Sequence, residues 1–367
     1  MPLAAHLEDV IVYDLSALGF GPFFAQQLPS PGDEGIPARV AAEHRGACEV
    51  WAATGSGRAR LAGRLRRDPG DTGFPGVGDW VILRHAPGPD RTSVIERVLE
   101  RRTVFTRGAA GREARVQVVA ANVDLVFVVC GLDADFNVHR IERYLARVWA
   151  GGAQPVVILN KADLCADTGA PVAEVEAHAV GVPVHVVSAL RLENLEAVRA
   201  DITAGTTVAL VGSSGAGKST LVNALLGEDR MRTGEVRAGD GRGCHVTTHR
   251  QLVLLPGGGL LLDTPGMREL QLLDEDGLDT VFGDVAALAE RCRFRDCRHD
   301  TEPGCAVRAA VESGELAADR LEHYRQLERE AQAFERRHDE RARRQYGREW
   351  GQRYDEILRM RRWKEGK

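Results

Sequence analysis

An uninterrupted run of small residues in the second half of the chain has the spacing of a phosphate-binding loop. It consists of Gly212, Ser213, Ser214, Gly215, Ala216, Gly217, Lys218, Ser219 and Thr220. This GxxxxGK[S/T] pattern lies between an apolar stretch at 207–211 and an amphipathic stretch at 219–226, as a strand–loop–helix unit requires. Glycines let backbone N–H groups converge on phosphates, and the helix N-terminus adds partial positive charge. We expect Lys218 to reach the β- and γ-phosphates of a nucleotide and the Ser219 hydroxyl to bind Mg²⁺.

A second motif, Asp263-Thr264-Pro265-Gly266, follows another apolar stretch about forty residues later. A carboxylate at the end of a strand near the P-loop suits the role of holding hydrated Mg²⁺. Gly266 permits its own N–H to approach a γ-phosphate. The two motifs together predict a nucleoside triphosphate site.

Asn160-Lys161-Ala162-Asp163 indicates which base the nucleotide carries. The Asp163 carboxylate can accept hydrogen bonds from N1–H and the exocyclic amine of guanine, a pair of donors that adenine lacks, so a wrong base would leave polar groups unpaired. We expect Asn160 to tie this base loop to the P-loop and the Lys161 stem to pack on the ring. Ser188 and Ala189 resemble the small loop whose backbone contacts the guanine oxygen.

The order of these motifs is unusual. Ordinary GTPases have the P-loop first and the base-reading motifs last, whereas here 160–163 and 188–189 precede 212–219 and 263–266. A parallel sheet accepts new termini at its loops without changing its packing. The sequence therefore predicts a circularly permuted GTPase domain, in which the switch region leads directly into the C-terminal segment.

A cysteine- and histidine-rich segment follows this domain. Cys292, Cys297, His299 and Cys305 supply three thiolates and one imidazole within fourteen residues. Four N/S ligands suit one tetrahedral structural Zn²⁺ and leave no open position for a catalytic water.

Composition and charge limit the possible partners. Hydrophobic residues make up 44% and charged residues 28%, as in globular proteins. No apolar run approaches the ~20 residues of a bilayer span and the start lacks a secretory pattern, so we expect a soluble, cytoplasmic protein. Residues 36–115 carry 15 Arg against nine acidic residues, and 320–367 carry 15 basic against ten acidic ones. These basic ends indicate an anionic partner, although solvated charged faces explain the charge alone equally well.

Short β-type stretches with intervening glycines and prolines fill residues 36–115, which predicts a small barrel of the OB type. Such barrels bind oligonucleotides on one face, and an ordinary barrel with a charged surface is the alternative. The expected strands are 38–45, 47–53, 63–65, 79–84 and 93–98. From residue 116, strands alternate with helices, as in a parallel sheet, and after about 275 the chain is mostly helical. We therefore predict a 1–35 extension, a 36–115 OB domain, a 116–275 GTPase domain, a 276–345 zinc domain and a 346–367 basic tail.

The permuted motifs, the preceding barrel and the following Cys-Cys-His-Cys segment resemble the RsgA (YjeQ) family of ribosome small-subunit-dependent GTPases. Gly78-Asp79-Trp80-Val81, 133–137 and 292–300 also look familiar from that family. The resemblance implies GTP hydrolysis stimulated by the small ribosomal subunit, a role late in its maturation, rRNA contacts by the OB and zinc domains, and release on hydrolysis. A monomer is our default expectation.

The same resemblance suggests the catalytic switch. The segment 241–248 is similar to the family's switch I but departs from it at Cys244 and Val246. By that match His245 orients or activates the attacking water, and Thr247 binds Mg²⁺, with Thr248 as the alternative. Residues 267–269 hold no glutamine to position water, so the water-positioning group must come from elsewhere.

Two other functions stay open. One is a GTPase that drives metal delivery or another assembly step, against which the closed four-ligand spacing argues. The other is an RNA-binding factor with a vestigial nucleotide site, against which the complete nucleotide motifs argue.

Overall fold

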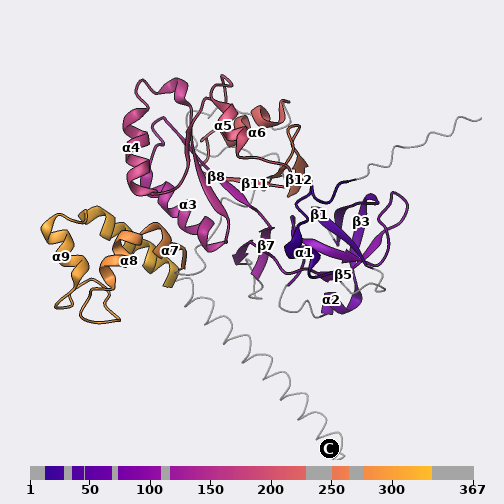
Figure 1. Cartoon of the computed structure of the whole chain (residues 1–367), viewed down its shortest axis with the longest axis horizontal. Coiled ribbons are helices and arrows are strands. Elements are labelled where there is room, and N and C mark those ends of the chain that lie inside the picture. The colour runs from indigo at the N-terminus through magenta and orange to yellow at the C-terminus, as the bar shows by residue number, and fades with distance from the viewer. Residues whose placement is uncertain are drawn as a thin grey trace, which may run out of the picture. The chain divides into compact units, whose positions relative to one another are not determined.

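The chain forms two compact units in the computed structural model (Figure 1). The first comprises Met1–Thr106 and Val118–Leu270, and the second comprises Arg107–Gln117 and Gln271–Lys367. The structure describes residues 13–28, 35–44, 46–67, 73–108, 116–228, 250–263 and 276–332. Among the helices of these residues, none is long and apolar enough to cross a membrane.

A closed five-stranded barrel begins the first unit. Its strands are β1 (Ile36–His44), β2 (Ala47–Ala52), β3 (Gly55–Leu61), β4 (Trp80–Leu83) and β5 (Ser93–Val98). They follow the order β1-β2-β3-β5-β4, and pairing between β1 and β4 closes the ring. Apolar side chains alternate toward the interior, where Val40, Val50, Val81 and Ile95 are fully buried. The predicted OB-type barrel is thus present.

One predicted barrel strand was wrong. Residues 63–65 belong to the helix α2 (Gly63–Arg67), and the missing strand is β3. β3 reads Gly-Ser-Gly-Arg-Ala-Arg-Leu, without the β-branched and aromatic residues that mark a strand in sequence. Its small residues are required by packing, because a Cβ on Gly57 would lie 2.6 Å from the backbone nitrogen of Gly88.

Among the described residues, six strands form the sheet of the predicted GTPase domain. They are β8 (Leu125–Gly131), β9 (Gln154–Asn160), β10 (Val184–Val186), β11 (Thr207–Val211), β12 (Gln251–Leu254) and β13 (Leu260–Asp263). Their order is β10-β9-β8-β11-β13-β12, and all run parallel except β12, which is antiparallel to β13. The P-loop strand β11 is therefore central, and the carboxyl ends of its parallel neighbours meet at one edge of the sheet.

Helices cover this sheet (Figure 1). They are α3 (Val138–Ala150), α4 (Gly169–His178), α5 (Leu195–Ala200) and α6 (Lys218–Leu226). Apolar residues of α5 and α6, including Val198 and Leu221, share one core with β8, β9 and β11. Shorter elements are α1 (Pro22–Ala25), the 3₁₀ turn η1 (Ala162–Leu164), and the paired strands β6 (Val104–Gly108) and β7 (Val116–Ala121), and each of these two strands contains residues of both units.

The barrel and the GTPase sheet are continuous. β1 pairs with β12 at Ala42 and Gln251, which produces one eleven-stranded sheet. The Arg250 guanidinium lies 3.6 Å from the Glu43 carboxylate beside this pairing. β12 follows the predicted switch segment in sequence. The barrel is therefore paired with the strand into which that segment leads.

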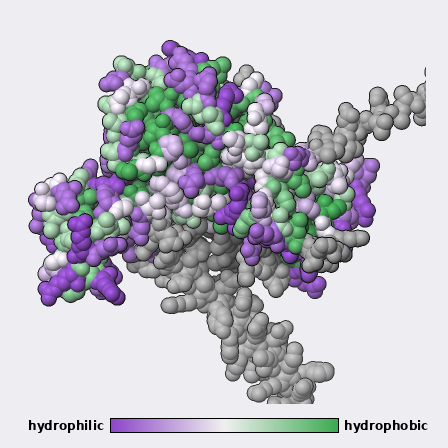
Figure 2. Space-filling view, in the orientation of Figure 1, coloured by the Kyte–Doolittle hydropathy of each residue, from purple (hydrophilic) through white to green (hydrophobic). Residues whose placement is uncertain are grey.

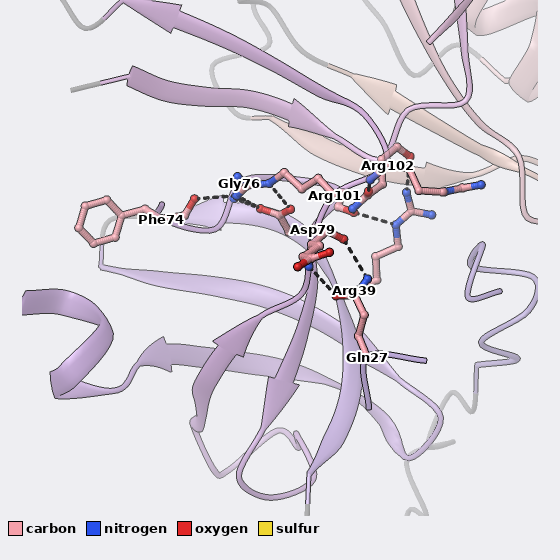
Figure 3. Close-up of polar contacts among 10 residues, drawn as sticks. Gln27, Arg39, Phe74, Gly76, Asp79, Arg101 and Arg102 are labelled. Carbon is pink, nitrogen blue, oxygen red and sulfur yellow. Dashed lines mark hydrogen bonds and ion pairs between the residues drawn. The ribbon is translucent and has the colours of Figure 1, made fainter. Parts of the chain in front are cut away.

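A buried polar network also joins the barrel to its neighbours (Figure 3). Arg39 is 1% exposed and donates to the carbonyl oxygens of Leu18, Gly78 and Asn122, which belong to three separate segments. Burial lowers the pKa of Arg39 to about 10, which leaves the guanidinium charged near neutral pH. Asp79 is fully buried and accepts two bonds of 2.7 Å from Arg101. Paired and hydrogen-bonded charges of this kind fix one arrangement of the segments.

The described residues of the second unit from 276 onward are mainly helical. It contains α7 (Asp276–Val281), α8 (Gly283–Ala289), α9 (Ala306–Ser313) and a helical segment at 318–332. Phe282 is fully buried, with its ring edge-to-face against His323 and Tyr324. Arg320 pairs with Asp284 at 2.5 and 2.9 Å. Figure 2 shows that hydrophilic side chains dominate the face of this unit that is in view.

Candidate functional site

The P-loop connects β11 to α6. At Gly212 and Gly217 its backbone has a conformation and surroundings that leave no room for a side chain. Gly212 has φ +142°, and a Cβ there would lie 2.1 Å from the carbonyl oxygen of Val129. Gly217 has φ +90°, and a Cβ would lie 2.2 Å from Nδ2 of Asn160. The loop therefore packs directly against β8 on one side and the base loop on the other.

Lys218 begins α6 and its side chain turns back over the loop. Its ammonium group donates to the carbonyl oxygen of Gly212 at 2.8 Å and to that of Ser213. This places the positive charge within the curve of the loop, next to the helix N-terminus. Ser219 and Thr220 follow in the first turn of α6. Backbone N–H groups, a helix terminus and an ammonium group together form a phosphate-binding cradle.

Asn160 connects three of the loops predicted to bind the nucleotide. Its Nδ2 donates to the carbonyl oxygen of Ala216 in the P-loop at 3.0 Å. Its Oδ1 accepts from the backbone N–H of Ala189 at 3.0 Å. The side chain is 2% exposed, so both bonds are buried. The segments 160–163, 188–189 and 212–219 therefore lie together at one edge of the sheet.

The base loop directs the Asp163 carboxylate. Lys161 has left-handed backbone angles, with φ +65°, and starts the turn η1 that carries Asp163. Ser188 donates its hydroxyl to Oδ1 of Asp163 at 2.6 Å, and Arg191 lies 3.9 Å from Oδ2. The carboxylate is thereby fixed in orientation and only 7% exposed. A carboxylate held in this way can discriminate between hydrogen-bond donors on a base.

The remaining predicted nucleotide residues are only partly covered by the structure. β13 ends at Asp263 beside β11, with Ala209 opposite Leu262, so the backbone of Asp263 reaches the edge that holds the P-loop. Gly266, His245 and Thr247 lie outside the described residues.

The four predicted metal ligands gather in the second unit. The ligand atoms of Cys292, Cys297, His299 and Cys305 all lie within 4.8 Å of one another. Sγ of Cys292 is 3.9 Å from Sγ of Cys305, and Nδ1 of His299 is 3.6 and 3.5 Å from these two sulfurs. Tetrahedral Zn²⁺ with bonds of about 2.3 Å to sulfur and about 2.05 Å to nitrogen requires separations of about 3.8 Å and 3.6 Å. The donor set therefore fits zinc.

Backbone N–H groups support two of these sulfurs. Ala306 donates to Sγ of Cys292 at 3.3 Å, and Arg308 donates to Sγ of Cys305 at 3.4 Å. Both donors are in the first turn of α9, which Cys305 caps. The start of this helix and the donor set thus depend on each other.

Comparisons with known proteins agree with this geometry. The RsgA GTPase family model matches residues 98–273. A small ribosomal subunit biogenesis GTPase RsgA of Opitutus terrae is 48% identical over 336 residues, which cover 89% of this chain and 92% of that protein. The RsgA protein of Streptomyces coelicolor is 44% identical and covers 92% of both chains. This chain belongs to the RsgA family.

Solved structures show the same fold. The crystal structure of YjeQ from Thermotoga maritima aligns with a TM-score of 0.62 and 27% identity, covering 81% of this chain and 99% of that one. YloQ, described as a circularly permuted GTPase, aligns with a TM-score of 0.60 at 24% identity. The circular permutation and the family resemblance predicted from the sequence are confirmed, and membership in RsgA makes the chain a GTPase by family.

Two carboxylates of this RsgA-family protein, which the sequence motifs did not predict, contact the nucleotide loops. Asp133 lies 2.5 Å from the Lys161 ammonium group, and Asp135 accepts a hydrogen bond from the Ser213 hydroxyl. Burial opposes ionisation of Asp135, but the bonds from Ser213 and Arg140 outweigh it and lower the pKa of this carboxyl. Their position in the sequence could have indicated this role, because they follow β8, the strand that neighbours both β9 and β11.

Proposed function

We propose that this RsgA-family protein binds GTP where the loops 160–163, 188–189 and 212–219 meet, and hydrolyses it during assembly of the small ribosomal subunit. The observation that carries the proposal is the buried Asn160 side chain, which bonds to two other nucleotide loops at once. The relatives named as small ribosomal subunit biogenesis GTPases support the process.

Guanine selectivity in this proposal comes from Asp163. Its carboxylate, oriented by Ser188, accepts two bonds from the guanine edge, while Lys161 covers one face of the ring and the 188–189 loop lies beside the guanine oxygen. Adenine would leave these buried groups unpaired, which strongly disfavours it.

Mg²⁺ fits the oxygen donors at the phosphate end of the site. Ser219 is the second residue of α6, and β13 brings the backbone of Asp263 to the same edge of the sheet. Hydroxyl and carboxylate oxygens are the ligands that Mg²⁺ prefers. Bound Mg²⁺ neutralises charge on the β- and γ-phosphates, and Thr247 is the proposed switch ligand. His245 is the proposed residue that orients the attacking water, and Gly266 offers its N–H to the γ-phosphate.

One structural Zn²⁺ is proposed for Cys292, Cys297, His299 and Cys305, because the donor separations match tetrahedral zinc. With all four positions taken by protein, the metal stabilises this unit and takes no part in hydrolysis.

Docking on rRNA is proposed through the barrel and the zinc unit. Helix α2 exposes Arg64, Arg66 and Arg67. The zinc loop exposes Arg291, Arg293, Arg295 and Arg298. Arginine contacts to phosphates weaken as salt increases, and folded RNA is recognised largely by its shape. We propose that a monomer acts in this way in the cytoplasm, with the domain boundaries given by the sequence analysis.

Replacing Asp163 with Asn tests the site. The variant presents an amide donor in place of an acceptor, so GTP affinity should fall about 100-fold or more while xanthosine triphosphate binding improves. Titration calorimetry with both nucleotides measures the change. Asp167→Asn, at an exposed carboxylate that accepts from Gly169, is the matched control and should leave both affinities unchanged. Unaltered guanine preference in the Asp163→Asn variant would refute the proposal.

A further inference from the structure

The turn between β8 and α3 contacts both halves of the proposed nucleotide site. It carries Asp133 and Asp135, whose carboxylates bind one side chain of the base loop and one of the P-loop. We propose that these two aspartates are positioning residues for the guanine nucleotide: Asp133 acts through Lys161, and Asp135 acts through Ser213. This inference rests on the proposed guanine-nucleotide site and assigns residues to its organisation.

Strand pairing brings Asp133 to the base loop. β8 and β9 are parallel neighbours with Gly131 opposite Asn160, so Asp133 and Lys161 both come just beyond the paired ends. Oδ2 of Asp133 lies 2.5 Å from Nζ of Lys161, and the two side chains are 27% and 24% exposed. A Cβ on Gly131 would lie 2.8 Å from Asp133 and 3.3 Å from Cδ of Lys161. Glycine at 131 therefore leaves room for both side chains.

The contact with Asp133 fixes a side chain that is otherwise flexible. Lysine loses rotamer freedom when it is held in one conformation. If the ammonium group is already anchored, the methylene stem is set as a flat surface before the base binds, and binding does not have to order it. The partner that orders Lys161 is thus supplied by the protein, in the turn that follows the neighbouring strand.

Asp135 makes the corresponding contact with the phosphate side. It accepts from the hydroxyl of Ser213, the second residue of the P-loop. Its other oxygen accepts from Nη1 of Arg140 at 2.6 Å. Arg140 is in the first turn of α3, where its N–H is capped by the Asn137 side chain at 2.8 Å. The Arg140 guanidinium balances the carboxylate charge, which would otherwise repel the phosphates across a short distance.

The two aspartates are also linked to each other. The backbone N–H of Asp135 donates to Oδ1 of Asp133 at 3.1 Å. One short turn therefore holds Lys161 and Ser213 in a fixed relation, although these residues are 52 positions apart in the numbering of the chain. The geometry assigns to this turn the spacing between the base loop and the phosphate cradle.

Double-mutant cycles on GDP affinity test the assignment in the full-length protein. Asp133→Ala and Lys161→Ala should each weaken GDP binding about tenfold, and the double variant should be no weaker than Lys161→Ala alone. Asp135→Ala and Ser213→Ala should be non-additive in the same way, whereas Asp90→Asn combined with Ser213→Ala should be additive. Asp133→Asn keeps an acceptor for Lys161 and should restore part of the affinity. Asp90→Asn, at an exposed carboxylate of the barrel, is the charge control.

The outcomes separate the two claims. Coupling within each pair, and additivity with Asp90→Asn, with unchanged unfolding midpoints, supports the assignment. Additive effects within the pairs would overturn it, even if an Asp133 or Asp135 variant is unstable, because Lys161→Ala and Ser213→Ala approach the same contacts from the other side. If the wild-type protein itself does not bind GDP, the proposed function fails and this inference fails with it, whereas GDP binding with additive effects overturns the inference alone.

Discussion

Single side chains set the geometry of the candidate nucleotide site. Asn160 bonds to Ala216 and Ala189, and Ser188 orients Asp163, so residues from three loops depend on a few buried contacts. Motif spacing predicted these residues because each must meet the same small ligand. It did not predict Asp133 and Asp135, since their partners are 28 and 78 positions away and only the order of the strands shows that the loops meet.

Asn160→Ala should weaken GTP and GDP binding to the same extent, by about 10- to 100-fold. The change leaves the carbonyl of Ala216 and the N–H of Ala189 unpaired in a buried place, at about 1–3 kcal/mol each. Equilibrium binding of a fluorescent guanine nucleotide measures it. Asn194→Gly is the control: it removes an exposed amide at φ +60°, a conformation that glycine tolerates, and should not alter binding. Wild-type affinity in Asn160→Ala would contradict the proposed connection of the loops.

At the scale of elements, strands with strong apolar patterns were predicted and weakly patterned ones were not. β11 matches its prediction over Thr207–Val211 because a strand buried on both faces needs a continuous apolar stretch. β3 was missed because close backbone approach, as at Gly57, selects small residues that carry no strand signal. In the second unit, the cysteine spacing was more informative than periodicity, since it predicted a cluster that the structure brings within 4.8 Å.

Removing zinc should affect the second unit selectively. α9 begins directly after Cys305, and its first-turn N–H groups donate to Cys292 and Cys305, so chelation should decrease helical circular dichroism while GTP binding persists. Cys297→Ser should have the same effect, and Cys165→Ser, outside the cluster, should keep both the metal and the helical signal. Metal content and circular dichroism before and after chelation provide the readout. Parallel loss of nucleotide binding would mean that the two units do not fold separately.

For the whole molecule, the permutation changes what the nucleotide domain is connected to. The barrel strand β1 pairs with β12, so one continuous sheet links the barrel to the strand that follows the predicted switch segment. This connection supports the proposal that a partner bound at the barrel influences GTP hydrolysis. Motif order in the sequence was sufficient to predict the permutation, whereas the pairing of β1 with β12 required the structure.

The rate of GTP hydrolysis against increasing concentration of purified small ribosomal subunits tests the account most directly. We predict a saturable increase of about tenfold or more over the basal rate. The increase should diminish as salt is raised and be absent with large subunits as the control. A rate that stays at its basal value at every small-subunit concentration would contradict the account and favour a GTPase that drives metal delivery or another assembly.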